Sequence, residues 1–581
     1  MSMRHVASAL AVFLSVIVLG AYCVIQIGQE ARAADAQRHA EFAVSFDGCS
    51  VKPWEDGEGD LYVFLPSYFD WNRTEIKVLD GTLLLDGSQV GAGGVLLGTY
   101  EEGTPYSYSL SFRDEKQSGE VTFMQSANIG SVFIETDSGS MEQVDADKEY
   151  REGGRILVMD EEGEISHIGV LDFIKGRGNA TWRSDKKSYA VKLSDAADLF
   201  GMGEAKDWIL LCNGYDGSKI QNKLCLDMAA AVGLEYSAQS TWSDLYLNGV
   251  YHGNYLLCEK VEAGENRVEI GDGFLIEKDY YYDKENGFFT EDGNPFSLSY
   301  PQTLPQEDLE EIAGHVQKIE DAVLAGDLEA AGEYLDWDSF ILRYTLDETV
   351  LNQDTGVTSM YFYKPEGDQK LYSGPIWDYD GCLGSGSNVA WMNHKVIAAT
   401  DIGNYKREGS LTWYPVLYQN EWFLERVREN YREIIRPYLL KMLEEGIDRY
   451  VERIRDSVQM DMLRWDYAAF GAGHYESYEN NIRYLKFFLA KRLGFLDEEW
   501  LGEENDYTGE GNGQIHTVIF QGDTETETVE VPDGERMLAV PEGLLEEGQW
   551  WYNARDGLAY TPDLPVLEDT VFQAHHGSPR E

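Results

Sequence analysis

The stretch from Asp354 to Gly384, DTGVTSMYFYKPEGDQKLYSGPIWDYDGCLG, constrains the fold of this chain more than any other. An acid on a glycine-containing loop is followed by two β-type runs, which the turn-rich PEGDQ joins into a predicted hairpin. The second run ends in Asp378, Tyr379 and Asp380. Because side chains alternate along a strand, we expect Asp378 and Asp380 on one face, roughly 7 Å apart, and Tyr379 on the other.

These three carboxylates have the chemistry of a divalent-cation site. Mg²⁺ and Mn²⁺ prefer oxygen ligands, and phosphates usually complete their coordination. In protein kinases an acid on a loop also acts as the base, and an acid further along the chain binds the metal. The alternative is an ordinary hairpin with solvated acids in its turns, which fits most Asp-Gly sequences. By itself the stretch is consistent with both interpretations.

The net charge restricts the partners of the protein. Lys and Arg number 47 against 103 Asp and Glu, so the formal charge is −56. Nucleic acids and anionic lipids require basic patches, and this excess of acids argues against both. It suits a soluble surface protein with basic or cation-rich partners. A basic cluster in such a chain is therefore a candidate anion site.

The length and the local patterns predict several domains. A chain of 581 residues with 43% hydrophobic residues is expected to form two to four globular domains. Short alternating runs predict an all-β accessory domain at 40–150. Strands mixed with helices, the clearest near 219–232, 305–350, 422–445 and 478–496, predict a central domain at 155–500. A β pattern returns at 510–575.

The N-terminus has the features of an export segment. Arg4 precedes an apolar run from Val6 to about Ile27, and Ala31-Arg32-Ala33 follows in a polar stretch. A charged start, an apolar middle and an A-x-A site predict that residues 1–33 form a signal peptide. The run is also long enough for an uncleaved membrane anchor. The protein is therefore expected outside the cytoplasm, either secreted or anchored at a bacterial cell surface.

Several other classes of site lack their signatures. The six cysteines include no C-x-x-C pair, which argues against zinc and against a dense disulfide framework and favours buried thiols. The histidines form no H-E-x-x-H motif, and no G-x-S-x-G elbow is present. Paired carboxylates also occur in glycosidases, but sugar hydrolysis does not need the basic glycine-rich strand described next.

The motif KGRGNATW, which begins at Lys175, is the strongest candidate for anion binding. Five cations lie between Lys175 and Lys187, and two glycines allow backbone N–H groups to approach a ligand closely. The motif is not a P-loop, since G-x-x-x-x-G-K-[ST] is absent. A solvated basic turn between two strands is the alternative. Lys192 ends the next apolar strand, as does the strand lysine that holds the α- and β-phosphates in kinases.

Four segments together resemble the spore-coat protein H (CotH) kinase family: GRGNATW, DWILLCNGYDGSKIQNKL, DLYLNGVYHGNYLLCEKVEAGENRVEI with GFLIEKD, and GPIWDYD. The likeness covers roughly residues 155–500. Members of that family are atypical, secreted or surface-associated protein kinases with a divergent kinase-like fold. The resemblance therefore implies an α+β, two-lobe domain with an ATP site between a β-rich lobe and a helical lobe.

The resemblance also implies roles for the acids. Asp354 would be the general base or would orient the acceptor. Asp378 would be the principal ligand of Mg²⁺ or Mn²⁺, and Asp380 would assist it. Kinases place an Asn for a second metal five residues after the catalytic Asp, whereas Ser359 occupies that position here. Asn352, which lies two residues before Asp354, is the alternative ligand for a second metal. A second metal site is therefore left open.

The same resemblance implies a nucleotide site on the β-rich side. Lys192 would hold phosphates together with Arg177 and Lys187. Glu259 belongs to Leu257–Val261, which would pass near the adenine as the hinge between the lobes. No glycine-rich lid of the form G-x-G-x-x-G-x-V is present, which departs from the pattern of protein kinases.

Residues 510–575 resemble the small β-rich repeat of internalin-type bacterial surface proteins, through V-x-V-x-x-G, a Pro-bounded turn and G-x-W. This resemblance implies a module that binds a cell wall or a partner or forms a stalk; an unrelated small β domain is the alternative.

The expected function is that of an exported protein kinase. It would transfer the γ-phosphoryl group of ATP, with Mg²⁺ or Mn²⁺, to Ser or Thr of another extracytoplasmic protein, and the acidity of the chain favours a basic substrate surface. One alternative is a non-catalytic surface scaffold that keeps the fold. The other is nucleotidyl transfer to protein by the same acids.

Overall fold

The computed structural model describes residues 40–46, 48–282, 285–385, 389–402, 410–465, 475–508, 513–537, 539–546, 548–555, 557, 559–562 and 564–576. The predicted export segment at 1–33 lies outside them. Within the described ranges, no helix has both the length and the apolar character needed to cross a membrane.

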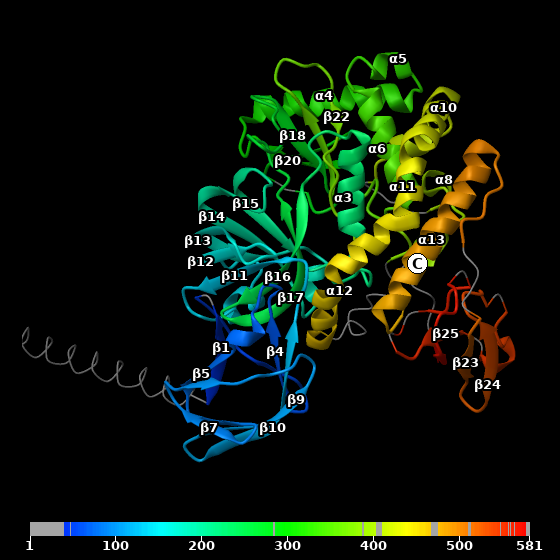
Figure 1. Ribbon diagram of the computed structural model, residues 1–581. Helices are drawn as coiled ribbons and strands as arrows, with labels where there is room; N and C mark the ends of the chain where they lie inside the picture. Colours follow the sequence, from blue (N-terminus) through cyan, green and yellow to red (C-terminus); the bar gives the residue numbers. More distant parts are fainter. Residues whose placement is uncertain are drawn as a thin grey trace, which may run out of the picture. The chain divides into compact units, whose positions relative to one another are not determined.

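The chain is an α+β protein that divides into two compact units (Figure 1). The first consists of the chain up to Leu65, of Phe69–Gln125 and of Gly249–Tyr251. The second consists of Pro66–Tyr68, Ser126–Asn248 and the chain from His252 onward.

The first unit contains two β-sheets. Their strand orders are β2 (Cys49–Val51), β1 (Glu41–Phe46), β5 (Glu75–Asp80), β8 (Val95–Leu97), and β3 (Trp54–Glu55), β4 (Leu61–Leu65), β10 (Glu115–Gln125), β9 (Pro105–Phe112), β6 (Thr82–Leu85), β7 (Ser88–Gly91). In β5, Ile76 and Val78 are buried while Glu75 and Lys77 are exposed, so this strand offers one apolar face to the core. The expected range of the accessory domain, 40–150, includes this unit and also the first strand of the second unit, Gly130–Thr136.

Seven strands form a closed barrel. Their order is β11 (Gly130–Thr136), β12 (Glu152–Met159), β13 (Ile165–Arg177), β14 (Ser188–Asp198), β15 (Glu204–Leu211), β17 (Val250–Glu259), β16 (Ser240–Leu247). Tyr189, Val191 and Leu193 of β14 are buried in the apolar core of the barrel. Lys192 lies between them in sequence and therefore points to the outer side of the barrel wall. A short helix, α2 (Glu142–Ala146), lies between β11 and β12.

A five-stranded antiparallel sheet and a set of helices follow the barrel. The strand order is β19 (Gly287–Phe289), β20 (Pro295–Tyr300), β18 (Phe274–Lys278), β21 (Met360–Lys364), β22 (Tyr372–Ser373). The helices that share one large apolar core with this sheet include α3 (Gln221–Val232), α4 (Gln306–Leu324), α6 (Trp337–Val350), α9 (Trp413–Leu417), α10 (Glu421–Asn430), α11 (Arg436–Lys441), α12 (Ile447–Arg464) and α13 (Tyr478–Leu496). Shorter helices are α5 (Leu328–Ala331), α7 (Val389–Met392) and α8 (Ala398–Asp401).

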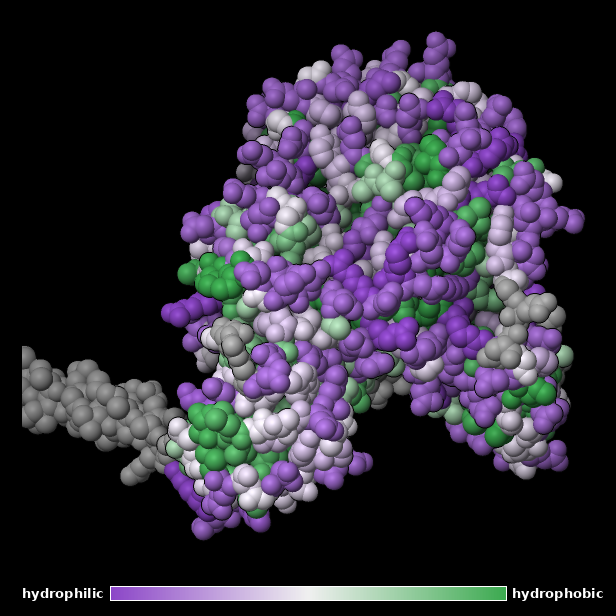
Figure 2. Space-filling model, in the orientation of Figure 1, coloured by the Kyte–Doolittle hydropathy of each residue, from purple (hydrophilic) through white to green (hydrophobic). Residues whose placement is uncertain are grey.

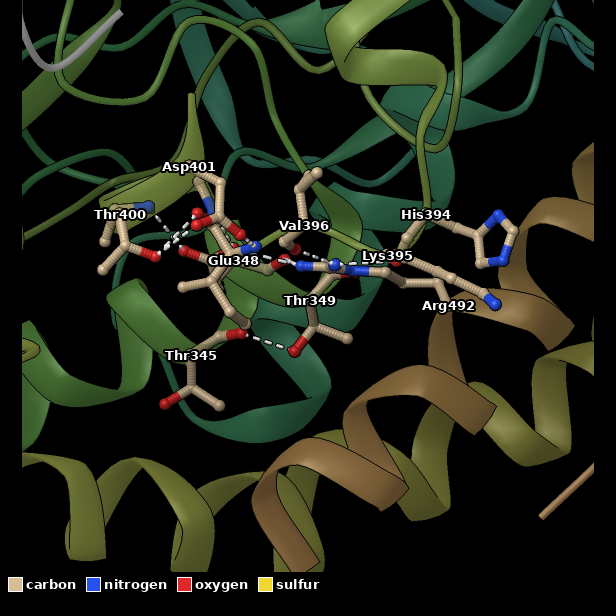
Figure 3. Close-up of polar contacts among 12 residues, drawn as sticks. Thr345, Glu348, Thr349, His394, Lys395, Val396, Thr400, Asp401 and Arg492 are labelled. Carbon is tan, nitrogen blue, oxygen red and sulfur yellow. Dashed lines mark hydrogen bonds and ion pairs between the residues drawn. The ribbon is translucent and has the colours of Figure 1, made fainter. Parts of the chain in front are cut away.

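A buried ion pair joins α6 to α13 inside this core (Figure 3). Arg492 and Glu348 are almost fully buried, and their N···O distance is 3.0 Å. Arg492 also donates to the carbonyls of Glu348, Thr349, His394 and Val396. Since an unpaired buried guanidinium is very costly, these contacts fix α13 against the end of α6 and against the segment after α7.

The last strands form a four-stranded sheet, which we call the C-terminal module (residues 513–576). Its order is β24 (Thr526–Pro532), β23 (Ile515–Gln521), β26 (Thr570–His576), β25 (Gln549–Asn553). Val518, Phe520 and Trp551 form its small apolar core. The module belongs to the second compact unit and appears in orange to red in Figure 1.

The hairpin expected after Asp354 is present as β21 and β22, but its second strand is shorter than expected. It ends at Ser373, and residues 374–379 form neither helix nor strand. Pro375 has no N–H for a ladder hydrogen bond, and Asp378 has a left-handed φ of 66°. The expectation that Asp378 and Asp380 share one face of a strand was therefore wrong.

Candidate functional site

A cleft of about 1520 Å³ in the second unit is lined by three groups of residues. The barrel and the loop after it provide Lys148, Arg177, Gly178, Asn179, Ala180, Thr181, Arg183, Ser188, Leu211, Asn213 and Tyr215. The sheet and the loops around the hairpin provide Glu277, Asp279, Tyr280, Tyr281, Gln353, Asp354, Val357, Thr358, Ser359, Tyr361, Trp377, Asp378 and Asp380. The C-terminal module provides Tyr552, Asn553, Ala554, Gly557, Ala559, Gln573, His575 and His576.

The three predicted acids line this one cleft. Asp354 follows the end of α6, and its backbone N–H donates to Asn352 Oδ1 at 3.2 Å, which shapes the loop. Asp378 and Asp380 follow β22. The hydroxyl of Ser359 lies 3.4 Å from Asp378 Oδ2, so the residue that replaces the expected Asn is beside the acid predicted to bind the metal.

The acid loop and the segment after β22 are tied to each other. The N–H of Gln353 donates to the carbonyl of Gly381 at 3.2 Å. A Cβ on Gly381 would lie 1.8 Å from the side-chain nitrogen of Gln353, so the absence of a side chain at Gly381 leaves room for the Gln353 amide. This contact fixes the spacing between Asp354 on one segment and Asp380 on the other.

Tyr379 anchors the segment that carries the other two acids. Its ring is fully buried, and its hydroxyl donates to Asp347 on α6. Its N–H donates to Asn222 Oδ1 on α3 at 2.7 Å. Asp347 is itself paired with the buried Arg343 at 2.8 Å. Tyr379 thus points into the core, while the acids on either side of it face the cleft.

Burial and mutual repulsion control the titration of the acids. Burial, and then the charge of Asp378, raise the pKa of Asp354 to about 8. Burial, followed by the charges of Asp378 and Asp354, raises the pKa of Asp380 well above its usual range. Neighbouring negative charges thus disfavour the ionised forms of Asp354 and Asp380. Within the described residues, however, no set of three or more His, Cys, Asp or Glu side chains already has the arrangement of a metal site.

Arg177 is the cation that faces the acids. It lies at the end of β13, with its guanidinium 5.1 Å from the centre of the Trp377 ring. Its positive charge acts against the rise in the pKa of Asp380, so the two groups interact across the cleft. Lys148 holds the neighbouring loop, because its Nζ donates to the carbonyl of Gly178 at 3.0 Å.

Three residues predicted to contact the nucleotide do not line the cleft. Lys192 forms an ion pair with Asp207 at 2.7 Å. Lys187 donates to the carbonyls of Trp182 and Ser184, each at 3.0 Å. Glu259 is paired with Arg267 at 2.7 Å and borders a separate pocket of about 160 Å³. The structure therefore brings together Asp354, Asp378, Asp380 and Arg177 of the seven predicted residues.

Sequence reasoning did not single out Glu277. It lies on β18, in the segment GFLIEKD, and lines the cleft beside the acids. Burial, and then the charge of Asp279, raise its pKa to about 8. The next residue, Lys278, points the other way, and its Nζ donates to the carbonyl of Val357 in the Asp354 loop at 3.0 Å. The alternation of strand side chains was the available signal for this pair.

One of the comparisons with known proteins identifies a family. The family model described as CotH kinase protein matches residues 174–496, which is more than half of the chain. Among solved structures, the crystal structure of a Helicobacter pylori proinflammatory kinase, CtkA, is similar at 13% identity over 54% of this chain and 94% of that chain, with a TM-score of 0.25. At this score the likeness carries no argument about the site. No curated protein matches.

Proposed function

This chain belongs to the CotH kinase protein family, and on that premise we propose that it is an atypical extracytoplasmic protein kinase. It would transfer the γ-phosphoryl group of ATP to Ser or Thr of secreted or surface proteins. The single observation that carries the proposal is that Asp354, Asp378, Asp380 and Arg177, from segments far apart in the chain, line one cleft.

The proposal treats the barrel as the nucleotide lobe and the sheet with its helices as the second lobe. The triphosphate would lie between Arg177 on the barrel side and the acids on the other side. Lys192 is paired with Asp207 on the outer side of the barrel wall. We therefore assign the main phosphate contact to Arg177. A direct role for Lys192 would require this ion pair to open.

The acids fit a divalent cation by their chemistry. They offer only oxygen donors, and the raised pKa values of Asp354 and Asp380 are consistent with negative charge that no cation fully compensates. Asp378 and Asp380 would hold Mg²⁺ or Mn²⁺, which when bound would neutralise charge on the phosphate oxygens.

Asp354 would orient the acceptor hydroxyl and accept its proton. A carboxylate with a pKa of about 8 is a better base than an exposed Asp once it is ionised. As the oxygen of Ser or Thr forms a bond to the γ-phosphorus, the bond from that phosphorus to the β-phosphate bridging oxygen breaks and ADP departs. Arg177 would stabilise the negative charge on the equatorial oxygens.

The cellular location is part of the proposal and depends on residues 1–33. Their charged start, apolar run and A-x-A site support export, with cleavage or membrane anchoring as the two outcomes. Detection of the mature N-terminus by mass spectrometry of the exported protein distinguishes them.

The test uses the protein without residues 1–33, Mn²⁺, a basic test protein, and ATP labelled in either the α or the γ phosphate. We expect transfer of the γ label only. Transfer of the α label would replace the kinase by a nucleotidyl transferase, and no transfer would favour a scaffold. Asp378→Asn should abolish transfer and leave the thermal unfolding temperature equal or higher, because one negative charge is removed from a group of neighbouring acids. Asp279→Asn, which changes another acid that lines the same cleft, is the matched control and should retain transfer.

A further inference from the structure

The C-terminal module does not behave as a separate appendage, because it docks on α13 and the residues before it. Tyr475 is buried, and its hydroxyl donates to the carbonyl of Pro565 at 2.5 Å. Asn480 donates to the carbonyl of Leu567 at 3.2 Å. The side chain of Leu567 belongs to the large apolar core of the second unit. Core packing and specific polar contacts together fix the module in place.

Charged groups add to this docking. Arg483 of α13 pairs with Asp533, whose side chain is fully buried and also contacts His516 at 2.9 Å. The segment before the module is held as well, since Asn505 donates to Asp497 at 2.8 Å. A carboxylate buried in this way needs its partners, so the docked position is specific.

The docked module forms one wall of the cleft. Tyr552 and Asn553 of β25, and Gln573, His575 and His576 of β26, line the same cleft as the acids. β25 is an edge strand of the module, and β24 forms the opposite edge. One side of the module therefore faces the site, while β24 lies at the far side of its sheet.

The three walls of the cleft differ in chemistry. The barrel provides the cations, Lys148, Arg177 and Arg183, and the hairpin segments provide the acids. The module provides amide, phenol and imidazole groups, all of which can form hydrogen bonds. Tyr280 and Tyr281, 55% and 62% exposed, add two more rings to the lining. Triphosphate belongs beside the cations, whereas hydrogen-bond donors, acceptors and rings suit a polypeptide.

We propose that β25 and β26 of the C-terminal module form the acceptor wall of the cleft, where they bind an extended segment of the protein substrate through Tyr552 and Gln573. This inference rests on the proposed kinase function and gives the module a role in substrate selection. The nucleotide is bound by the other two walls. The module therefore determines which protein segments bring a hydroxyl to Asp354.

The first test separates acceptor binding from nucleotide binding. The double variant Tyr552→Ala/Gln573→Ala should raise KM for a lysine-rich histone about tenfold, because two side-chain contacts to the acceptor are lost, while KM for ATP stays as in the wild type. The matched control Glu527→Ala/Thr528→Ala changes two exposed residues of β24 in the same module and should leave both constants unchanged. An unchanged histone KM in the first variant, with normal thermal unfolding, would overturn the proposal.

A second readout does not depend on phosphoryl transfer. A photo-crosslinking amino acid at position 573 should capture the histone, whereas the same group at position 528 should not. Capture of the histone at position 573 without phosphoryl transfer would support the acceptor wall and contradict the proposed kinase activity. Phosphoryl transfer without capture of the histone at position 573 would support the kinase activity and contradict the acceptor wall. Absence of both, or equal capture at both positions, also rejects the wall.

Discussion

At the scale of single residues, Glu277 shows how the cleft disfavours the ionised form of a carboxyl group. Its carboxyl group lies on β18 near Asp279 and Asp378, and burial keeps it protonated up to a pKa of about 8. An unfolded chain would release this proton near pH 4.5. Between these two values the unfolded state holds fewer protons than the folded state. The contribution of Glu277 to stability is therefore complete below pH 4.5 and decreases as the pH rises towards 8.

We predict that Glu277→Gln makes stability less dependent on pH. Gln cannot ionise, so the difference in unfolding free energy between variant and wild type should grow between pH 5 and 8, by at most about 1.4 kcal/mol per pH unit. Urea unfolding at several pH values measures this difference. A constant difference over the whole range would mean that Glu277 ionises in the folded protein as it does in water.

The residues also show what sequence alone can and cannot predict about the site. Asp354, Asp378 and Asp380 were predicted correctly to lie together, since a hairpin brings its two ends into proximity. The basic cluster was less informative. Lys186 is fully buried against Asp461 at 2.7 Å, whereas Lys175 pairs with Glu149 and Arg177 faces the cleft. Partners so distant in the sequence leave no local pattern, so five similar cations could not be told apart.

At the scale of elements, local signals were sufficient where a helix has a clear start. α13 spans Tyr478–Leu496 as predicted, because Ser477 caps it by accepting from the N–H of Asn480 and its apolar residues follow the helical period. The helix expected at 422–445 is instead interrupted by π-helical turns at 431–435 and 442–446 and continues to Arg464. Such insertions keep the helical period on both sides, so the sequence does not reveal them.

The ion pair between α6 and α13 gives a prediction about these elements. Arg492→Leu should destabilise the protein by about 3–5 kcal/mol, because Glu348 would remain buried without its cation. Arg492→Lys should also be destabilising, since an ammonium group cannot reach the several carbonyls that the guanidinium contacts. Chemical denaturation of the two variants and the wild type provides the free energies.

Arg426→Ala is the matched control for this prediction. Arg426 is paired with Asp338 on the surface of α6, where side chains are partly exposed, and exposed pairs contribute only about 0–1 kcal/mol. Equal losses in Arg492→Leu and Arg426→Ala would show that the buried pair does not join the two helices as described.

At the scale of the whole molecule, the residues that line the cleft show which of the two units contains the candidate site. Every residue that lines it comes from the second unit. The boundary between the units was difficult to predict, because β11 follows the strands of the first unit as one more short β-type run. A period of two shows that a strand has one apolar face, but it does not show which sheet the strand joins.

The charge of −56 acts on the whole molecule as well. Hydrophilic side chains cover most of the face of the second unit drawn in Figure 2, so much of this charge repels itself across the surface. Salt shortens the range of such repulsion to about 10 Å at roughly 0.1 M. We therefore predict that the unfolding temperature rises by a few degrees between low salt and about 0.3 M NaCl, since about 1 kcal/mol corresponds to roughly 2–4 °C in domains of 150–250 residues.

Divalent cations should have a second, local effect on the unfolding temperature, because they bind to the acids of the cleft. Millimolar Mg²⁺ or Mn²⁺ at constant ionic strength should raise the unfolding temperature further, because a cation that binds the folded state alone stabilises it. Asp378→Asn should lose this increment and keep the response to NaCl, which depends on the total charge. An equal divalent increment in both proteins would contradict the role of Asp378, because the cations would then act only by screening the surface.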